Sequence, residues 1–362
     1  MIARLLLLAG LLVSLPAQAR PAPPPGTPVD AFVAESPDPG GLDTLFLVNL
    51  LTGETEEQSV TGRQYSMVGD EVVFLDDSSG RVQAVSADGA LREHPLIQPA
   101  AGARRIDLAY SPLANLVAWT VTEGTPDALT TTTYVASPEG AGARMVLRDG
   151  PRPGIRAFPI GFSDDGATLY MDYQPDTIAD LAPLRQYAAM LALDLASGAL
   201  SSLPGEASCY CGGAVGSGQF ARLALADAGF DLRVTDLASN RADVIDSLGL
   251  AEYTQAGDML LSPDGSKAFY TLLQLVPGGA PGEVRVVYVV ADLVAGRQRA
   301  LNADSPDERL LRPVGWSNDG SAVLLTDPTE PGTWRLDLFS GETERVADAS
   351  FIGSTVAAPA VR

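Results

Sequence analysis

The chain has 362 residues, 46% of them hydrophobic, and a formal net charge of −21 at pH 7. This acidic excess argues against binding to nucleic acid or to an anionic membrane surface, because like charges repel. After the first residues, no segment approaches the roughly 18 consecutive apolar residues of a membrane-spanning helix. We therefore expect no membrane span.

The amino terminus has the pattern of an export signal. Residues 1–19 contain a single basic residue, Arg4, then an apolar run, and end in Ala17-Gln18-Ala19. This pattern is typical of a secretory signal peptide, and its apolar part is too short for a lasting membrane span. Residues 20–28 are rich in proline and predict an extended leader. We expect an exported protein, either periplasmic or secreted.

A short motif occurs seven times along the rest of the chain. In each copy an apolar run ends in a tight turn, and a Gly or Asn stands where the turn needs a positive φ angle. The copies are NLLTGET (49–55), VSADGAL (85–91), ASPEGAG (136–142), LDLASGAL (193–200), TDLASNRA (235–242), ADLVAGRQ (291–298) and LDLFSGET (336–343). Their spacing is that of propeller blades, so residues 29–358 predict an all-β, seven-bladed β-propeller of four-stranded antiparallel blades.

A second repeat supports this fold and carries a family resemblance. Its clearest copies are YSPLANLVAW (110–119), FSDDGATLYM (162–171), LSPDGSKAFY (261–270) and WSNDGSAVLL (316–325). Their Ser and Asp side chains can bond the backbone of a turn, which predicts a hairpin between the first two strands of a blade. The pattern resembles the WD-repeat-like propellers of TolB-type proteins and the non-catalytic propeller of prolyl-oligopeptidase-like proteins. This resemblance implies a fold but no function, since such repeats serve scaffolds, sensors and enzymes alike.

One blade is predicted to be built from both ends of the chain. Six complete blades are expected near residues 61–97, 104–149, 155–204, 208–247, 254–301 and 311–348. Residues 29–35 and 43–60 then supply the second to fourth strands of the last blade, and residues 349–358 supply its first strand. Such closure removes exposed sheet edges from the ring.

No catalytic set is recognisable in the sequence. Residues 161–163 and 315–317 resemble the start of a hydrolase nucleophile elbow, but Asp165 and Asp319 stand where its second glycine belongs. We interpret these aspartates as solvated turn residues. His94 is the single histidine, and we interpret it as an exposed surface residue. We expect no catalytic residue, no metal site and no cofactor.

Cys209 and Cys211 leave three alternatives open. In an extended strand their Cα atoms would lie roughly 6.5–7 Å apart, at the upper limit for a disulfide. A bulge at Gly212-Gly213 would bring them closer. The pair therefore forms two packed thiols, a disulfide or part of a metal site, and the absence of a nearby histidine makes zinc the weakest of the three.

Arginine residues precede several of the predicted inner strands. We expect Arg63, Arg105, Arg156 and Arg312 to surround one mouth of the central channel and to bind a ligand there. The planar guanidinium group fits carboxylate and phosphate. The alternative is that these residues pair with nearby acids such as Asp107 and only neutralise local charge.

Two classes of function remain open. The favoured one is an exported, monomeric, non-enzymatic propeller that binds a protein, a peptide or an anionic cell-envelope ligand. The alternative is a propeller enzyme, such as a hydrolase, lyase or lactonase-like protein, with a carboxylate and metal site in the central channel. Converging carboxylates in the channel would favour the enzyme, whereas an arginine-lined mouth would favour the binding protein.

Overall fold

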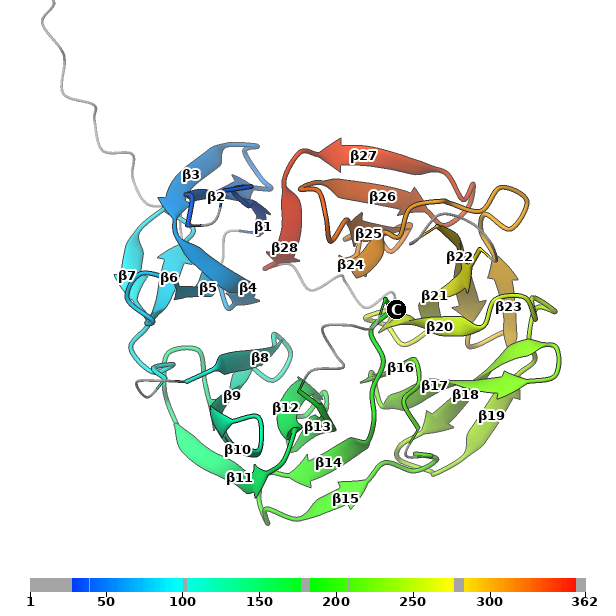
Figure 1. The fold of residues 1–362 in the computed structure, drawn as a ribbon, viewed down its shortest axis with the longest axis horizontal. Helices are drawn as coiled ribbons and strands as arrows, with labels where there is room; N and C mark the ends of the chain where they lie inside the picture. The colour runs from blue at the N-terminus through cyan, green and yellow to red at the C-terminus, as the bar shows by residue number, and fades with distance from the viewer. Residues whose placement is uncertain are drawn as a thin grey trace, which may run out of the picture.

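The chain folds into seven four-stranded antiparallel sheets that surround a central axis (Figure 1). The computed structural model describes residues 28–38, 40–99, 103–176, 183–207, 209–276 and 283–355. The predicted seven-bladed propeller is therefore confirmed. The predicted signal peptide, residues 20–27 of the leader and residues 356–358 lie outside the described residues. In the described ranges no helix is long and apolar enough to cross a membrane.

Six blades are continuous in sequence, and each runs in chain order from the channel outwards. Blade 2 contains β4 (Gly62–Val68), β5 (Glu71–Asp76), β6 (Val82–Ser86) and β7 (Leu91–Glu93). Blade 3 contains β8 (Arg105–Ser111), β9 (Leu116–Thr125), β10 (Ala128–Ala136) and β11 (Arg144–Arg152). Blade 4 contains β12 (Ile155–Phe162), β13 (Thr168–Pro175), β14 (Met190–Asp194) and β15 (Leu200–Ser202).

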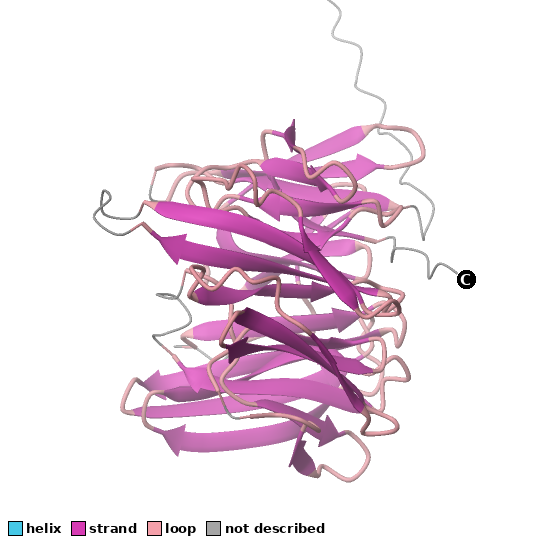
Figure 2. Cartoon of the chain, turned by 90° about the vertical axis from the view of Figure 1, so that its right-hand side faces the viewer, coloured by secondary structure: helices cyan, strands magenta, loops and turns pink. Residues whose placement is uncertain are grey.

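The remaining continuous blades complete the far side of the ring. Blade 5 contains β16 (Gly213–Gly216), β17 (Gln219–Ala226), β18 (Gly229–Asp236) and β19 (Ala242–Ile245). Blade 6 contains β20 (Gln255–Leu261), β21 (Lys267–Leu275), β22 (Val284–Asp292) and β23 (Arg297–Ala300). Blade 7 contains β24 (Arg312–Trp316), β25 (Ala322–Thr326), β26 (Thr333–Asp337) and β27 (Thr343–Ala347). The strands run between two faces, both of which carry loops (Figure 2).

Blade 1 closes the ring with strands from both ends of the chain. Its order is β28 (Ser350–Ser354), β1 (Val29–Ala34), β2 (Asp43–Asn49) and β3 (Thr55–Val60). The backbone N–H of Val29 donates to Thr355 Oγ1 over 2.7 Å, and Thr355 N–H donates back to Val29 O over 2.9 Å. The predicted closure is confirmed, including the innermost place of the C-terminal strand.

Serine and aspartate stabilise the hairpin turns as the repeat predicts. Asp165 Oδ1 accepts a bond from Ser163 Oγ at 2.6 Å and from the backbone N–H of Ala167 at 3.0 Å. These bonds lower the pKa of the Asp165 carboxyl, beginning with the one from Ser163. Ser317 bonds Asp319 in the same way, at 2.7 Å. Both serines therefore act as turn residues.

Candidate anion-binding site at the channel mouth

The described residues that immediately precede β14 extend to the centre of the ring. We call residues 183–189 the strap; in Figure 1 it runs from β14 inwards towards β20. Tyr187 and Cys211 exchange both backbone hydrogen bonds, at 2.9 and 3.0 Å. The N–H of Arg185 donates to Asp258 Oδ1 over 2.7 Å, and the N–H of Asp258 donates to Arg185 O over 2.9 Å. The strap thus ties blade 4 to the segment entering blade 5 and to blade 6.

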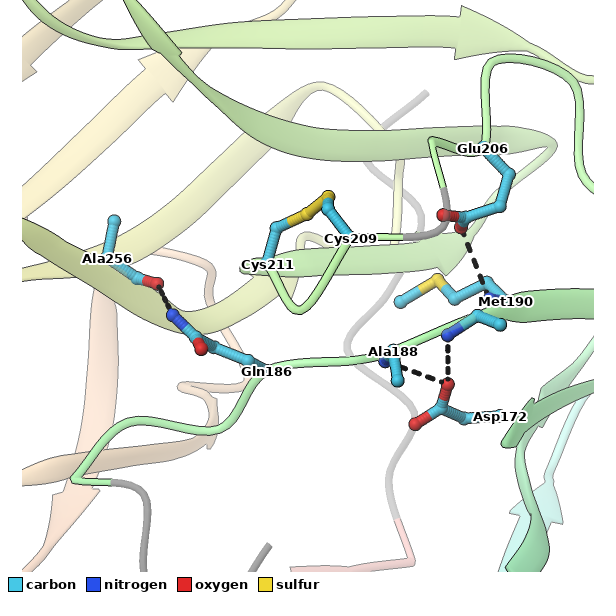
Figure 3. Close-up of a disulfide and its surroundings, with 9 residues drawn as sticks. Asp172, Gln186, Ala188, Met190, Glu206, Cys209, Cys211 and Ala256 are labelled. Atoms are coloured by element: carbon cyan, nitrogen blue, oxygen red, sulfur yellow. Dashed lines mark hydrogen bonds between the residues drawn. A yellow bond between two sulfur atoms is a disulfide. The ribbon is translucent and has the colours of Figure 1, made fainter. Parts of the chain in front are cut away.

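A buried carboxylate anchors the other end of the strap. Asp172 Oδ1, in β13, accepts the backbone N–H groups of Ala188 at 3.1 Å and Ala189 at 2.9 Å (Figure 3). Burial raises the pKa of Asp172 to about 6, the backbone bonds lower it in part, and the Glu206 carboxylate adds to the rise. Glu206 in turn accepts the N–H of Met190 at 3.2 Å.

Cys209 and Cys211 form a disulfide beside the strap (Figure 3). Their Cα atoms lie 5.5 Å apart, which is within the ordinary range for a disulfide. The separation is shorter than in an extended strand, and Cys211 lies outside the named strands, in an isolated bridge to Tyr187. Tyr210, between the two cysteines, lines a cavity at the channel mouth.

A cavity of about 560 Å³ opens at the channel mouth next to the strap. Four guanidinium groups line it: Arg105 from β8, Arg156 from β12, Arg185 from the strap and Arg312 from β24. Asp107 is the carboxylate among the lining residues. Aromatic and amide side chains complete much of the wall, namely Tyr65, Phe158, Tyr187, Tyr210, Gln64, Gln174 and Gln186.

Two of these arginines belong to an ion-pair network in the cavity wall. Arg156 is only 2% exposed, and its Nη1 lies 2.6 Å from Asp107 Oδ2. Its Nε lies 3.4 Å from Asp176 Oδ1, and its guanidinium stacks 4.5 Å from the ring centre of Phe158. Arg105 Nε lies 2.9 Å from Asp107 Oδ1. Arg105 and Arg156 therefore line the cavity and also pair with acid, and ligand binding by them stays a prediction.

The other two arginines differ in their surroundings. Arg312 is half-buried and its Nη2 donates to Pro183 O, a neutral acceptor on the strap, over 2.9 Å. Arg185 is exposed, and no carboxylate in the described part of the chain forms an ion pair with its side chain. The positive charges of Arg185 and Arg312 both act to lower the pKa of the Asp258 carboxyl, but burial has the larger effect and raises this pKa. Among the four lining arginines, Arg185 is the one whose side chain is exposed.

The structure separates one predicted residue from this group and adds another. Arg63, in β4, pairs with Asp77 at the surface and is not among the lining residues of the cavity. Arg185 was absent from the sequence-based set because it lies within a blade rather than between two blades. Its position depends on the contacts with Asp258 and Cys211 that hold the strap, and no local motif signals them.

His94 is buried, so its interpretation as an exposed residue was wrong. The side chain is 2% exposed, and Nδ1 accepts the backbone N–H groups of Leu96 at 3.2 Å and Ile97 at 3.0 Å. Burial, with a contribution from the Arg92 charge, lowers its pKa to about 4. The neutral imidazole therefore stabilises the loop after β7.

Across the described ranges, no three His, Cys, Asp or Glu side chains gather as a set that could hold a metal ion.

Comparison with known proteins identifies the fold. No protein-family model and no curated protein sequence matches the chain. An oligogalacturonate lyase in complex with manganese is similar in structure, with a TM-score of 0.55 and 12% identity, over 89% of this chain and 85% of that one. The acylaminoacyl peptidase of Pyrococcus horikoshii gives a TM-score of 0.55 and 12% identity over 88% of this chain, which spans only 50% of the peptidase.

TolB from Acinetobacter baumannii is also similar, with a TM-score of 0.47 and 11% identity, over 95% of this chain and 88% of that one. The expected resemblance to TolB-type and prolyl-oligopeptidase-like propellers is one of fold, which the seven four-stranded blades of this chain confirm. At these identities the likeness extends to the fold alone.

Proposed function

We propose that the chain is a non-enzymatic propeller, acting after export, that binds a protein, a peptide or a cell-envelope component carrying an anionic group. The observation that supports this most is the convergence of Arg105, Arg156, Arg185 and Arg312 on one cavity. These residues come from three blades of a molecule whose net charge is −21. They create a local positive field, and their planar forks suit carboxylate or phosphate.

The arrangement of the remaining polar groups supports binding rather than hydrolysis. The cavity wall offers mainly guanidinium and amide groups, with Asp107 engaged by two arginines. Ser163 and Ser317 bond their own turns, and the His94 imidazole accepts bonds from its own loop. A nucleophile needs a base within hydrogen-bond reach, and neither serine has the histidine as a partner.

Calorimetric titration with citrate and with inorganic phosphate tests the proposal. We expect both anions to bind, and binding to weaken as salt is added because exposed charges are screened. Replacing Arg185 with Gln should weaken binding by roughly tenfold, the loss of one charge-assisted contact.

The matched control is Arg241→Gln, which removes the same charge from an exposed pair with Asp243 in blade 5. Equal affinities in the wild type and Arg185→Gln, or the absence of anion binding, would overturn the proposal.

A further inference from the structure

A second cavity adjoins the arginine-lined one and differs in character. It has a volume of about 540 Å³ and shares Gln186 and Tyr210 with the first cavity. Its walls include the Cys209–Cys211 disulfide and the apolar side chains of Leu223, Leu225 and Phe230, with Arg222 as the one charged residue among the described residues that line it. Leu225 is 75% exposed, which leaves a large apolar side chain in water. A pocket with four arginines beside one that holds several apolar side chains suits a ligand with an anionic group and an apolar group.

Two amide side chains of the first cavity indicate a further group on the ligand. Gln174, at the end of β13, is only 4% exposed, and within the described residues its Oε1 has no hydrogen-bond partner. Gln64 is only partly buried as a residue, but its Oε1 is buried and also has no hydrogen-bond partner among the described residues. A buried acceptor without a donor is unfavourable, so a ligand that brings an N–H group would gain from binding here. The cavity thus offers sites for both a carboxylate and an N–H donor.

We propose that the two cavities bind the C-terminal end of a peptide chain. Arg185 and Arg312 hold the terminal carboxylate, Gln174 Oε1 accepts a backbone N–H, and the last side chain, an apolar one, enters the disulfide-lined cavity. A peptide end carries these three groups together, whereas inorganic phosphate lacks the apolar group and a fatty acid lacks the N–H. This inference rests on the proposed function and names the ligand class for the same site.

An array of short peptides attached by their amino termini tests the inference. Each sequence is presented with a free terminal carboxylate and with an amidated terminus, and the final residue is Leu, Phe, Gly or Asp. We expect binding of free termini that end in Leu or Phe. In solution titrations of the selected peptides, amidation should weaken binding by roughly tenfold or more, because a charge-assisted contact is lost.

The outcomes separate this inference from the proposed function. If free and amidated peptides bind equally, or laurate competes as well as the best peptide, the C-terminal assignment is wrong. If citrate or phosphate still binds in a manner that depends on Arg185, the anion-binding function stands without it. If neither peptides nor simple anions bind, both are wrong.

Variants of exposed leucines test the apolar subsite without disturbing the core. Leu225→Ser should weaken binding of peptides ending in Leu by roughly tenfold, the value of burying one such side chain, and should leave phosphate binding unchanged. The control is Leu113→Ser, because Leu113 is 68% exposed and lies in the hairpin at the other end of β8. An equal effect of Leu225→Ser on peptides ending in Leu and in Gly would overturn the subsite.

Discussion

The guanidinium of Arg156 and the carboxylate of Asp107 join blades 3 and 4 at the channel mouth, with 2.6 Å between Nη1 and Oδ2. Asp107 belongs to β8 and Arg156 to β12, and Asp176 contacts the same guanidinium from the end of β13. All three side chains are largely buried. The pair therefore fixes the geometry of the cavity wall as well as its charge.

Replacement of Arg156 with Ala should destabilise the fold. The substitution removes the positive charge that pairs with the largely buried carboxylates of Asp107 and Asp176. Loss of this buried charge should lower the unfolding free energy by about 3–5 kcal/mol. Urea denaturation measures this loss. The control is Arg63→Ala, since Arg63 pairs with Asp77 at the surface and its loss should cost less than about 1 kcal/mol. Similar losses in the two variants would contradict the prediction.

Deletion of residues 349–362 should strongly lower the melting temperature. It removes β28, exposes the edge of β1 and takes away the partly buried Ile352 that packs against the blade 1 core. We expect a decrease of roughly 10 °C or more, measured by calorimetry. Deletion of residues 356–362 alone serves as the control that keeps β28. A protein without residues 349–362 that melts like the control would contradict the role of β28 in ring closure.

The ring was predictable because its turns are local and repeated. Gly53 and Asn240 occupy the same place in two copies of the motif, and both have positive φ angles, of 73° and 59°. A residue type that satisfies a local backbone requirement leaves the same signal in every blade. The number of copies then fixes the number of blades, and the incomplete blade at residues 29–60 indicates that a strand from the carboxyl terminus closes the ring.

The candidate site was predictable only in part. Arg105, Arg156 and Arg312 stand at or near the starts of inner strands, so their place in the repeat placed them at the mouth. Arg185 depends on a strap held by contacts distant in sequence, and no repeat position marks it. The burial of His94 could not be predicted from the sequence either, because it follows from the packing of the loop after β7 and not from the residues beside it.

The buried Asp172 carboxyl should make the fold less stable as pH rises from about 4 to about 6. Its pKa is about 6 in the folded protein and near 3.8 when unperturbed, so the folded state retains the proton to higher pH. The destabilisation by Asp172 is therefore absent below the unperturbed pKa and complete above the pKa of the folded protein. Asp172→Asn keeps an acceptor for the strap and should raise the unfolding free energy at pH 7 by on the order of 2–3 kcal/mol.

Urea denaturation at a series of pH values measures this effect as a difference between the variant and the wild type. The difference should vanish near pH 4. His94 acts in the opposite direction, because its lowered pKa favours the unfolded state as pH falls below about 6.5, but it is present in both proteins. A pH-independent difference between the two proteins would show that Asp172 does not titrate as described.

Reduction of the Cys209–Cys211 disulfide should loosen the strap while changing global stability little. The disulfide closes a ring with a single residue between its cysteines, so it removes little entropy from the unfolded chain. It does fix Tyr210 and the backbone bridge between Cys211 and Tyr187, which position the cavity wall.

After treatment with a dithiol, hydrogen exchange should accelerate at residues 183–189 and remain unchanged in β21. Citrate affinity should fall roughly fivefold, because the preorganisation of the cavity wall is lost. The double variant Cys209→Ser, Cys211→Ser should match the reduced protein and show no further response to dithiol. Unchanged exchange in the strap after complete reduction would contradict this role of the disulfide.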